Sequence, residues 1–139
     1  MNKNVVIACL TRRAQAFASG QLVDIEHLLV TPTETGGTLR WEMGINWPVA
    51  MTPALFSTLQ DALLGQPLGD CLWDFFEMYH WVAHEFATQG RPVTVLRYPF
   101  TLLYRDGISR RESDSIEVVA TIWRDEDQSL VITFKLASE

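Results

Sequence analysis

The chain has 139 residues, a formal net charge of −6 and an apolar fraction of 47%. This length is typical of one domain, and the apolar fraction is too high for a disordered chain. The acidic balance disfavours a nucleic-acid-binding module, which would carry a basic surface. We therefore expect one globular domain over residues 1–139 and no nucleic acid among its partners.

The amino-terminal apolar run, residues 5–10, is too short for a signal-peptide core or a membrane span. We therefore expect a cytoplasmic protein without a membrane partner. The run itself indicates a buried strand or an extended entry segment. Cys9 and Cys71 both lie in apolar surroundings, which favours reduced, buried thiols over a disulfide or a zinc site.

Capping residues predict a short helix near the amino terminus. Thr11 can cap it, residues 12–19 are rich in Ala, and Gly20 fits the position that follows a helix end. Residues 21–25 then form a brief extended stretch, and Asp24 caps a turn of helix.

The middle of the chain contains its clearest loop, residues 31–37, which are rich in Thr, Gly and Pro. We expect a helical turn over 39–43 that ends at Gly44. Pro48 lacks a backbone N–H, so any strand over 45–51 is expected at the edge of its sheet.

Two helices follow in the sequence. Thr52 and Pro53 form an N-cap and first-turn pair that starts a helix running to about residue 64. After a tight connection over 65–69, the longest predicted helix covers 70–89 and ends at Gly90. At helical spacing its apolar residues form one stripe, which comprises Leu72, Phe75, Phe76, Tyr79, Val82, Ala83 and Phe86.

The last third predicts an antiparallel meander. Residues 93–98 and 100–105 are strand-like, and Pro99 between them indicates a bend or an edge. Asp106-Gly107 is a hairpin signal. The whole pattern predicts an α+β domain in which a C-terminal antiparallel β-meander packs against two or three helices.

The alternation of the last two strands also predicts their register. In each of these strands the apolar residues alternate with more polar ones and have even numbers. The apolar residues of both strands lie on one face only if the numbers of facing residues sum to an even value. Pairing Ile122 with Ile132 and Ala120 with Phe134 satisfies this condition. It leaves residues 126–128 as a three-residue loop.

Two tryptophans of the long helix lie outside the centre of its apolar stripe. Large aromatic side chains outside a core are enriched at binding surfaces. Alternatively, neighbouring loops such as 31–44 fold over these rings and form a second small core. The candidate binding surface comprises Trp73, Glu77, His80, Trp81 and His84.

Other clusters have simpler explanations. His80 and His84 have the spacing of two metal ligands, but two ordinary histidines on a solvated polar face explain them better. The arginines around residues 105–111 indicate either an anion site or a mixed-charge hairpin end. The acidic residues 125–127 are typical of a solvated loop. We expect no catalytic residues, metal or cofactor.

Two stretches resemble a family of uncharacterised small proteins carried on bacterial plasmids and phages. Residues 11–25 match its "TRxxAxxxGxLVD" opening and residues 47–52 its "WPVAxT" step, followed by a Leu-Trp pair at 72–73 and a "VITxxL" strand at 131–136. The chain departs from the family by an insertion over 31–43 and by a long hairpin over 98–114. The resemblance implies an accessory protein of a mobile genetic element.

These observations predict a non-enzymatic protein that binds another protein, such as a component of a host defence or regulatory system. The acidic composition, the off-stripe aromatics and the resemblance together motivate this expectation. The alternative is an enzyme or small-molecule-binding protein whose site lies between the 70–89 helix and the sheet, near His80, His84 and Arg97. The sequence leaves the oligomeric state open.

Overall fold

The structure is a computed structural model that describes residues 12–30, 32, 36–62, 68–105, 110–125 and 128–139. Its helices are α2 (Arg12–Ala18), α3 (Glu26–Leu29), α4 (Leu39–Glu42), α5 (Pro53–Asp61) and α6 (Leu68–Thr88). Its strands are β1 (Val23–Asp24), β2 (Val49–Met51), β3 (Val95–Arg105), β4 (Arg110–Arg124) and β5 (Leu130–Leu136). The predicted 5–10 segment, Cys9, the Thr11 cap and the 106–107 turn lie outside the described residues.

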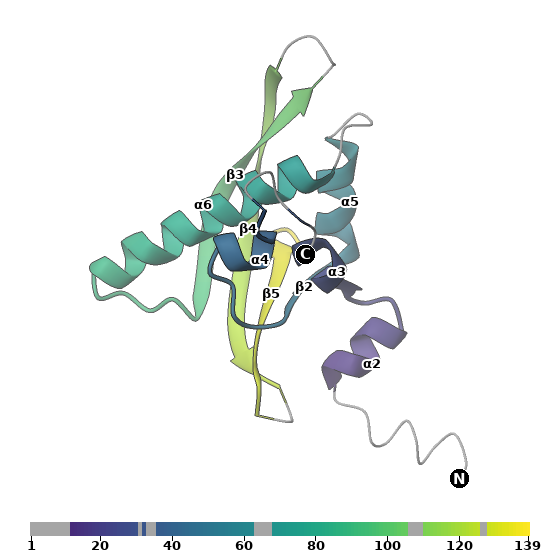
Figure 1. The fold of residues 1–139 in the computed structure, drawn as a ribbon, viewed down its shortest axis with the longest axis vertical. Coiled ribbons are helices and arrows are strands. Elements are labelled where there is room, and N and C mark those ends of the chain that lie inside the picture. Colours follow the sequence, from purple (N-terminus) through teal and green to yellow (C-terminus); the bar gives the residue numbers. More distant parts are fainter. Residues whose placement is uncertain (1–11, 31, 33–35, 63–67, 106–109, 126–127) are drawn as a thin grey trace.

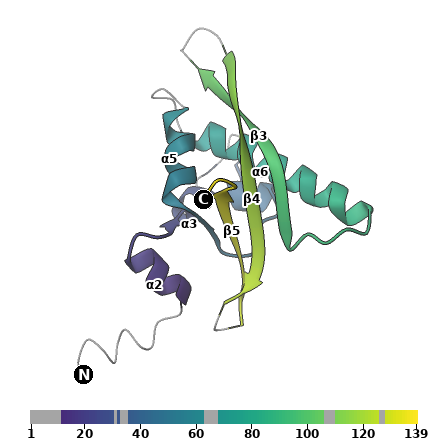
Figure 2. The same ribbon diagram turned by 180° about the vertical axis from the view of Figure 1, so that it is seen from behind.

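The strands form one sheet in the order β1-β2-β5-β4-β3. All neighbours are antiparallel except β2 and β5, which are parallel. Helix α6 crosses in front of the sheet in Figure 1 and behind it in Figure 2, so it covers one face. The prediction of an α+β fold with a C-terminal meander is therefore confirmed. We call the opposite side of the sheet its outer face.

The register of β4 and β5 is the predicted one. Ile122 faces Ile132 and Ala120 faces Phe134, which directs the apolar side chains of both strands toward α6. The ladder ends where Asp125 N donates to Ser129 O at 2.8 Å. This contact agrees with a three-residue loop, although residues 126 and 127 are outside the described set.

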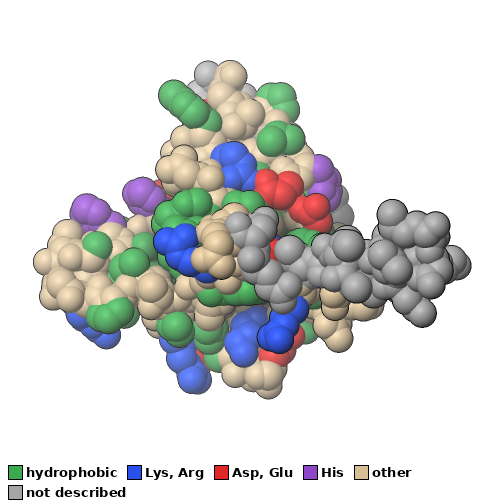
Figure 3. Space-filling view, turned by 90° about the horizontal axis from the view of Figure 1, so that it is seen from below, with side chains coloured by type: hydrophobic (Ala, Val, Ile, Leu, Met, Phe, Trp, Pro, Cys, Tyr) green, Lys and Arg blue, Asp and Glu red, His purple; other side chains and the backbone are tan. Residues whose placement is uncertain are grey.

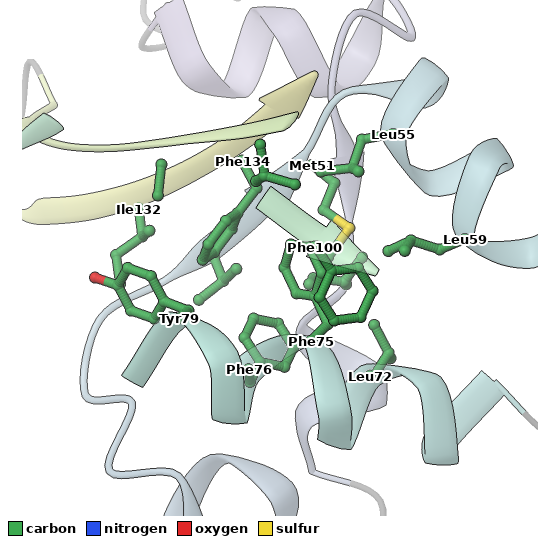
Figure 4. Close-up of a cluster of buried hydrophobic side chains, with 14 of the residues drawn as sticks. Met51, Leu55, Leu59, Leu72, Phe75, Phe76, Tyr79, Phe100, Ile132 and Phe134 are labelled. Atoms are coloured by element: carbon green, nitrogen blue, oxygen red, sulfur yellow. The ribbon is translucent and has the colours of Figure 1, made fainter. Parts of the chain in front are cut away.

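An aromatic cluster fills the space between α6 and the sheet (Figure 4). The ring of Phe75 makes edge contacts with Phe76, Phe100 and Phe134, with centroids 5.1–5.3 Å apart. Tyr79 contacts Phe134 in the same way at 5.1 Å. Edge-to-face geometry adds to the burial of these large rings, which makes this layer the centre of the core. The predicted stripe of α6 is therefore its core face.

Glycines end the helices as predicted. Gly20 and Gly90 have φ values of 80° and 69°, a left-handed conformation that a side chain would strain. After Gly90, Arg91 N donates to Phe86 O at 2.9 Å, and the guanidinium of Arg91 lies 3.9 Å from the centroid of the Phe86 ring. This arrangement closes the last turn of α6 and covers its final aromatic residue.

The structure corrects the prediction for the segment after Pro48. Strand β2 lies in the interior of the sheet, between β1 and β5, and not at an edge. Pro48 precedes the strand and contributes only its carbonyl, which accepts from Ile132 N at 2.9 Å. Because no N–H of Pro48 is required, an interior strand can start directly after it.

Pro99 lies within a continuous β3, so it does not interrupt the strand as expected. The other expectation for this proline is confirmed, because β3 is an edge strand of the sheet. Thr94 O accepts from Ile122 N, and the hydrogen-bonding positions alternate along an antiparallel pair. The nitrogen of Pro99 therefore points to the free edge. A proline there removes a donor that another chain could use.

Two smaller expectations also change. Helix α6 begins at Leu68, two residues before the predicted start at Asp70. Cys71 is half-buried against the core and not fully buried. Among the described helices, none combines the length and the apolar character needed to cross a membrane.

Candidate functional site

The side of α6 that faces away from the sheet carries most of the candidate binding surface. Trp81 is 60% exposed. Glu77, His80 and His84 are also exposed, because the buried stripe occupies the other side of the helix. Trp73 differs, since it is half-buried and packs against the core. The structure thus brings four of the five candidate residues onto one exposed helix side.

The segment around α4 covers part of α6. Helix α4 lies against α6 in both ribbon views (Figures 1 and 2). Leu39 and Met43 are buried and join the same core as the α6 stripe. The described part of residues 31–44 therefore joins the main core and does not form a second one, and Trp81 stays exposed.

This cover carries an exposed aromatic of its own. Trp41 is 79% exposed, because Leu39 and Met43 take the buried side of α4 and direct residue 41 away from it. A Cβ added at Gly37 would lie 3.3 Å from Cε3 of Trp41, so the edge of the indole rests close to the glycine backbone. Trp41 N donates to the Thr38 hydroxyl, which caps α4. The indole is thus presented from a fixed backbone.

An ionic clamp fixes the segment between α4 and β2. Arg40 pairs with Glu26 of α3, and its Nη1 donates to the carbonyls of Ile45 and Trp47 at 3.0 and 3.1 Å. The other carboxylate oxygen of Glu26 accepts from Val49 N at 2.7 Å. The clamp therefore positions Trp47, whose side chain is 38% exposed.

The sequence analysis did not include Trp41, Trp47 or Trp123 among the site residues, although the sequence holds signals for two of them. Leu39 and Met43 have the i, i+4 spacing of one helix side, which places Trp41 on the other. Trp123 falls in the outward set of the β4 alternation and is 38% exposed on the outer face. Its Nε1 donates to the Thr133 hydroxyl at 3.4 Å. Four of the five tryptophans are therefore at least one-third exposed.

The groups named for the alternative site do not meet. His80 and His84 are exposed on α6, whereas Arg97 lies on the outer face and pairs with Glu117. This hydrogen bond lowers the pKa of Glu117 and raises that of Arg97. The layer between α6 and the sheet holds apolar rings (Figure 4). Within the described residues, no group of three or more His, Cys, Asp or Glu side chains could hold a metal ion.

Charged side chains of both signs are mixed on the face that Figure 3 shows, where Lys and Arg lie beside acidic and apolar side chains. The side chains of the arginine cluster at 105, 110 and 111 lie outside those described. The acidic turn differs from the expectation of a solvated loop, because Asp125 is buried.

Comparisons with known proteins found no family model, no curated protein and no solved structure that matches this chain.

Proposed function

We propose that this chain is an accessory protein of a mobile genetic element that acts by binding another protein, a component of a host defence or regulatory system. The proposed contact surface comprises Trp41 and Trp81 with Glu77, His80 and His84. The observation that carries the proposal is the exposure of the two indoles, 79% and 60%, beside a closed aromatic core. The resemblance of residues 11–25 and 47–52 to plasmid and phage proteins supports the biological setting.

Exposed indoles are costly in water and valuable in an interface. A tryptophan buries roughly 150–250 Å² when it is enclosed, and apolar burial contributes about 25 cal/mol per Å². Since 60–79% of each side chain is exposed, enclosing either ring would contribute about 2–5 kcal/mol before the costs of association. Trp41 and Trp81 both belong to the helical side of the molecule, so one partner of ordinary interface size could cover both.

The chemistry around Trp81 indicates the kind of partner. The neighbouring Glu77, His80 and His84 add hydrogen-bonding groups and little positive charge. The net charge of −6 disfavours polyanions, including nucleic acid. A neutral or basic protein surface with an apolar recess for an indole fits this composition best.

The test is capture of a partner from host lysate over a salt series, followed by calorimetry with the purified partner. Trp81→Ser and Trp41→Ser should each weaken binding at least about tenfold. Val95→Ser is the matched control, because Val95 is 61% exposed but lies on the outer face of β3. Binding that the control weakens as much as the tryptophan variants, or no partner at any salt concentration, would contradict the proposal.

A further inference from the structure

One buried side chain of helix α2 contacts the outer face of the sheet. Arg13 is 5% exposed and is the only buried residue of the helix. The core, whose described members begin at Val23, includes no side chain of α2. Figures 1 and 2 both show this helix apart from α5 and α6. Among the described residues of α2, Arg13 therefore makes the one fully buried side-chain contact.

The contacts of Arg13 are polar and concentrated on β5. Its Nη1 donates to the Thr133 hydroxyl at 2.9 Å and its Nη2 to Ile132 O at 3.2 Å. Thr133 points to the outer face, because its neighbour Phe134 points to the core. The ring of Phe17, one helical turn on, lies 5.4 Å from the guanidinium carbon.

Carboxylates stabilise the charge of Arg13 in this buried position. Burial lowers the pKa of Arg13, whereas the negative charges of Asp125, Glu26 and Asp24 raise it. Asp125 is itself buried, at the end of the β4–β5 ladder. The contacts of Arg13 with the sheet are thus charge-assisted hydrogen bonds, which are lost together when the guanidinium leaves.

We infer that α2 is a latch, a helix that detaches from β5 when the Arg13 contacts break while α5, α6 and the sheet remain folded. A seven-residue helix is unstable in isolation, so detachment and unwinding occur together. Opening exposes the strip of β5 around Thr133, next to Trp123. The latch thereby controls access to the outer face, on the side of the sheet opposite the proposed partner surface.

The indole of Trp123 can report on whether the Arg13 contacts are formed. The Thr133 hydroxyl accepts from both Arg13 Nη1 and Trp123 Nε1. Removal of the guanidinium takes away one of these two donors and changes the surroundings of the indole. In protein that contains 5-fluorotryptophan, the ¹⁹F resonance of Trp123 should shift in Arg13→Gln, and the other four should keep their positions.

Amide exchange of the full chain tests the latch directly. Ser19 and Gln21 donate to the carbonyls of Gln15 and Ala16, both at 2.9 Å, so their amides report on α2. In the wild-type protein they should exchange through local opening, at least about tenfold faster than the most protected amides of α5 and α6. Arg13→Gln should accelerate them about 10- to 100-fold more and leave α5 and α6 unchanged.

Arg12→Gln is the control, since it removes the same charge from an exposed position of the same helix. It should accelerate the exchange of α2 at least about threefold less than Arg13→Gln does. Equal exchange rates in α2 and α6 of the wild-type protein would overturn the latch. So would an Arg13→Gln variant that leaves α2 unchanged, that accelerates exchange everywhere, or that does not fold.

Discussion

The carboxylate of Glu26 joins the guanidinium of Arg40 to the backbone N–H of Val49. One oxygen pairs with Arg40, and the other accepts from Val49 N at 2.7 Å. Val49 is buried and starts the short interior strand β2. A single side chain of α3 therefore holds both the cover that carries Trp41 and the first residue of the strand that pairs with β5.

Two substitutions of Glu26 should destabilise the fold to different extents. Glu26→Gln keeps an acceptor for Val49 N and loses the ion pair, which is partly exposed, so we expect a loss of about 1 kcal/mol. Glu26→Ala also leaves the buried N–H without a partner and should cost about 2–3 kcal/mol. Urea unfolding measures both values. Glu77→Gln, on the exposed side of α6, should change stability by less than about 0.5 kcal/mol; equal losses in both Glu26 variants would contradict this role.

The pair of Arg97 and Glu117 predicts a local titration. The hydrogen bond from Arg97 lowers the pKa of Glu117, so the pair stabilises the fold above the ordinary carboxyl pKa and this contribution is lost as the pH falls. Arg97→Gln should return the pKa of Glu117 toward its ordinary range in a side-chain carboxyl NMR titration. Arg91→Gln, at the end of α6, should leave it depressed. An unchanged pKa in Arg97→Gln would show that the pair does not form in solution.

The features that the sequence predicted well are those set by local rules. Gly20 and Gly90 end helices because a left-handed residue closes the last turn. The pairing of Ala120 with Phe134 follows from parity, since any odd shift would turn one apolar set to solvent. Such rules need only the residues of one or two neighbouring elements.

The features that the sequence did not reveal depend on distant partners. Strand β2 has three residues and no measurable periodicity, and its parallel pairing with β5 involves the far end of the chain. Asp125 was expected in solvent, but it is buried on the side of the sheet where Arg13 docks. For the candidate site, periodicity located Trp81, whereas the partial burial of Trp73 is set by packing against the core.

Removal of the Tyr98 hydroxyl should not lower the free energy of unfolding and should even raise it. The hydroxyl is buried between α6 and the sheet, and no described group forms a hydrogen bond with it. Such a hydroxyl costs free energy, so Tyr98→Phe should keep stability at neutral pH or raise it by about 1 kcal/mol. A loss above about 1 kcal/mol would show that the hydroxyl has a partner in solution.

Tyr98 should also make the stability of the fold depend on pH in the alkaline range. Burial, and secondarily the nearby Tyr79, raise the pKa of Tyr98, so the folded state keeps the phenol neutral. The contribution of neutral Tyr98 to the free energy of unfolding is fully present below the ordinary tyrosine pKa. It is lost as the pH rises above that value, because the unfolded chain then ionises first. Tyr98→Phe should reduce this loss in urea unfolding at pH values from about 8 to 11. Phe100→Leu, a neighbouring change without a hydroxyl, should lower stability equally over this range.

The β4–β5 loop contains a side chain in a backbone conformation that favours glycine. Gln128 has a φ of 73°, and its N–H donates to Asp125 O at 2.9 Å, which fixes this conformation. Three-residue hairpin loops commonly place glycine at such a position. Gln128→Gly should therefore raise stability by about 0.5–1 kcal/mol, because the relief of strain exceeds the added entropy of the unfolded chain.

Thermal unfolding of Gln128→Gly should show a higher midpoint with the exchange pattern of β4 and β5 retained. Gln89→Gly is a matched control near the end of α6, where φ is not positive. Glycine at residue 89 gains no relief and adds entropy to the unfolded chain, so the midpoint should fall. A fall in both variants would mean that Gln128 contributes contacts in the loop that outweigh its strain, and that the left-handed conformation is maintained by its side chain.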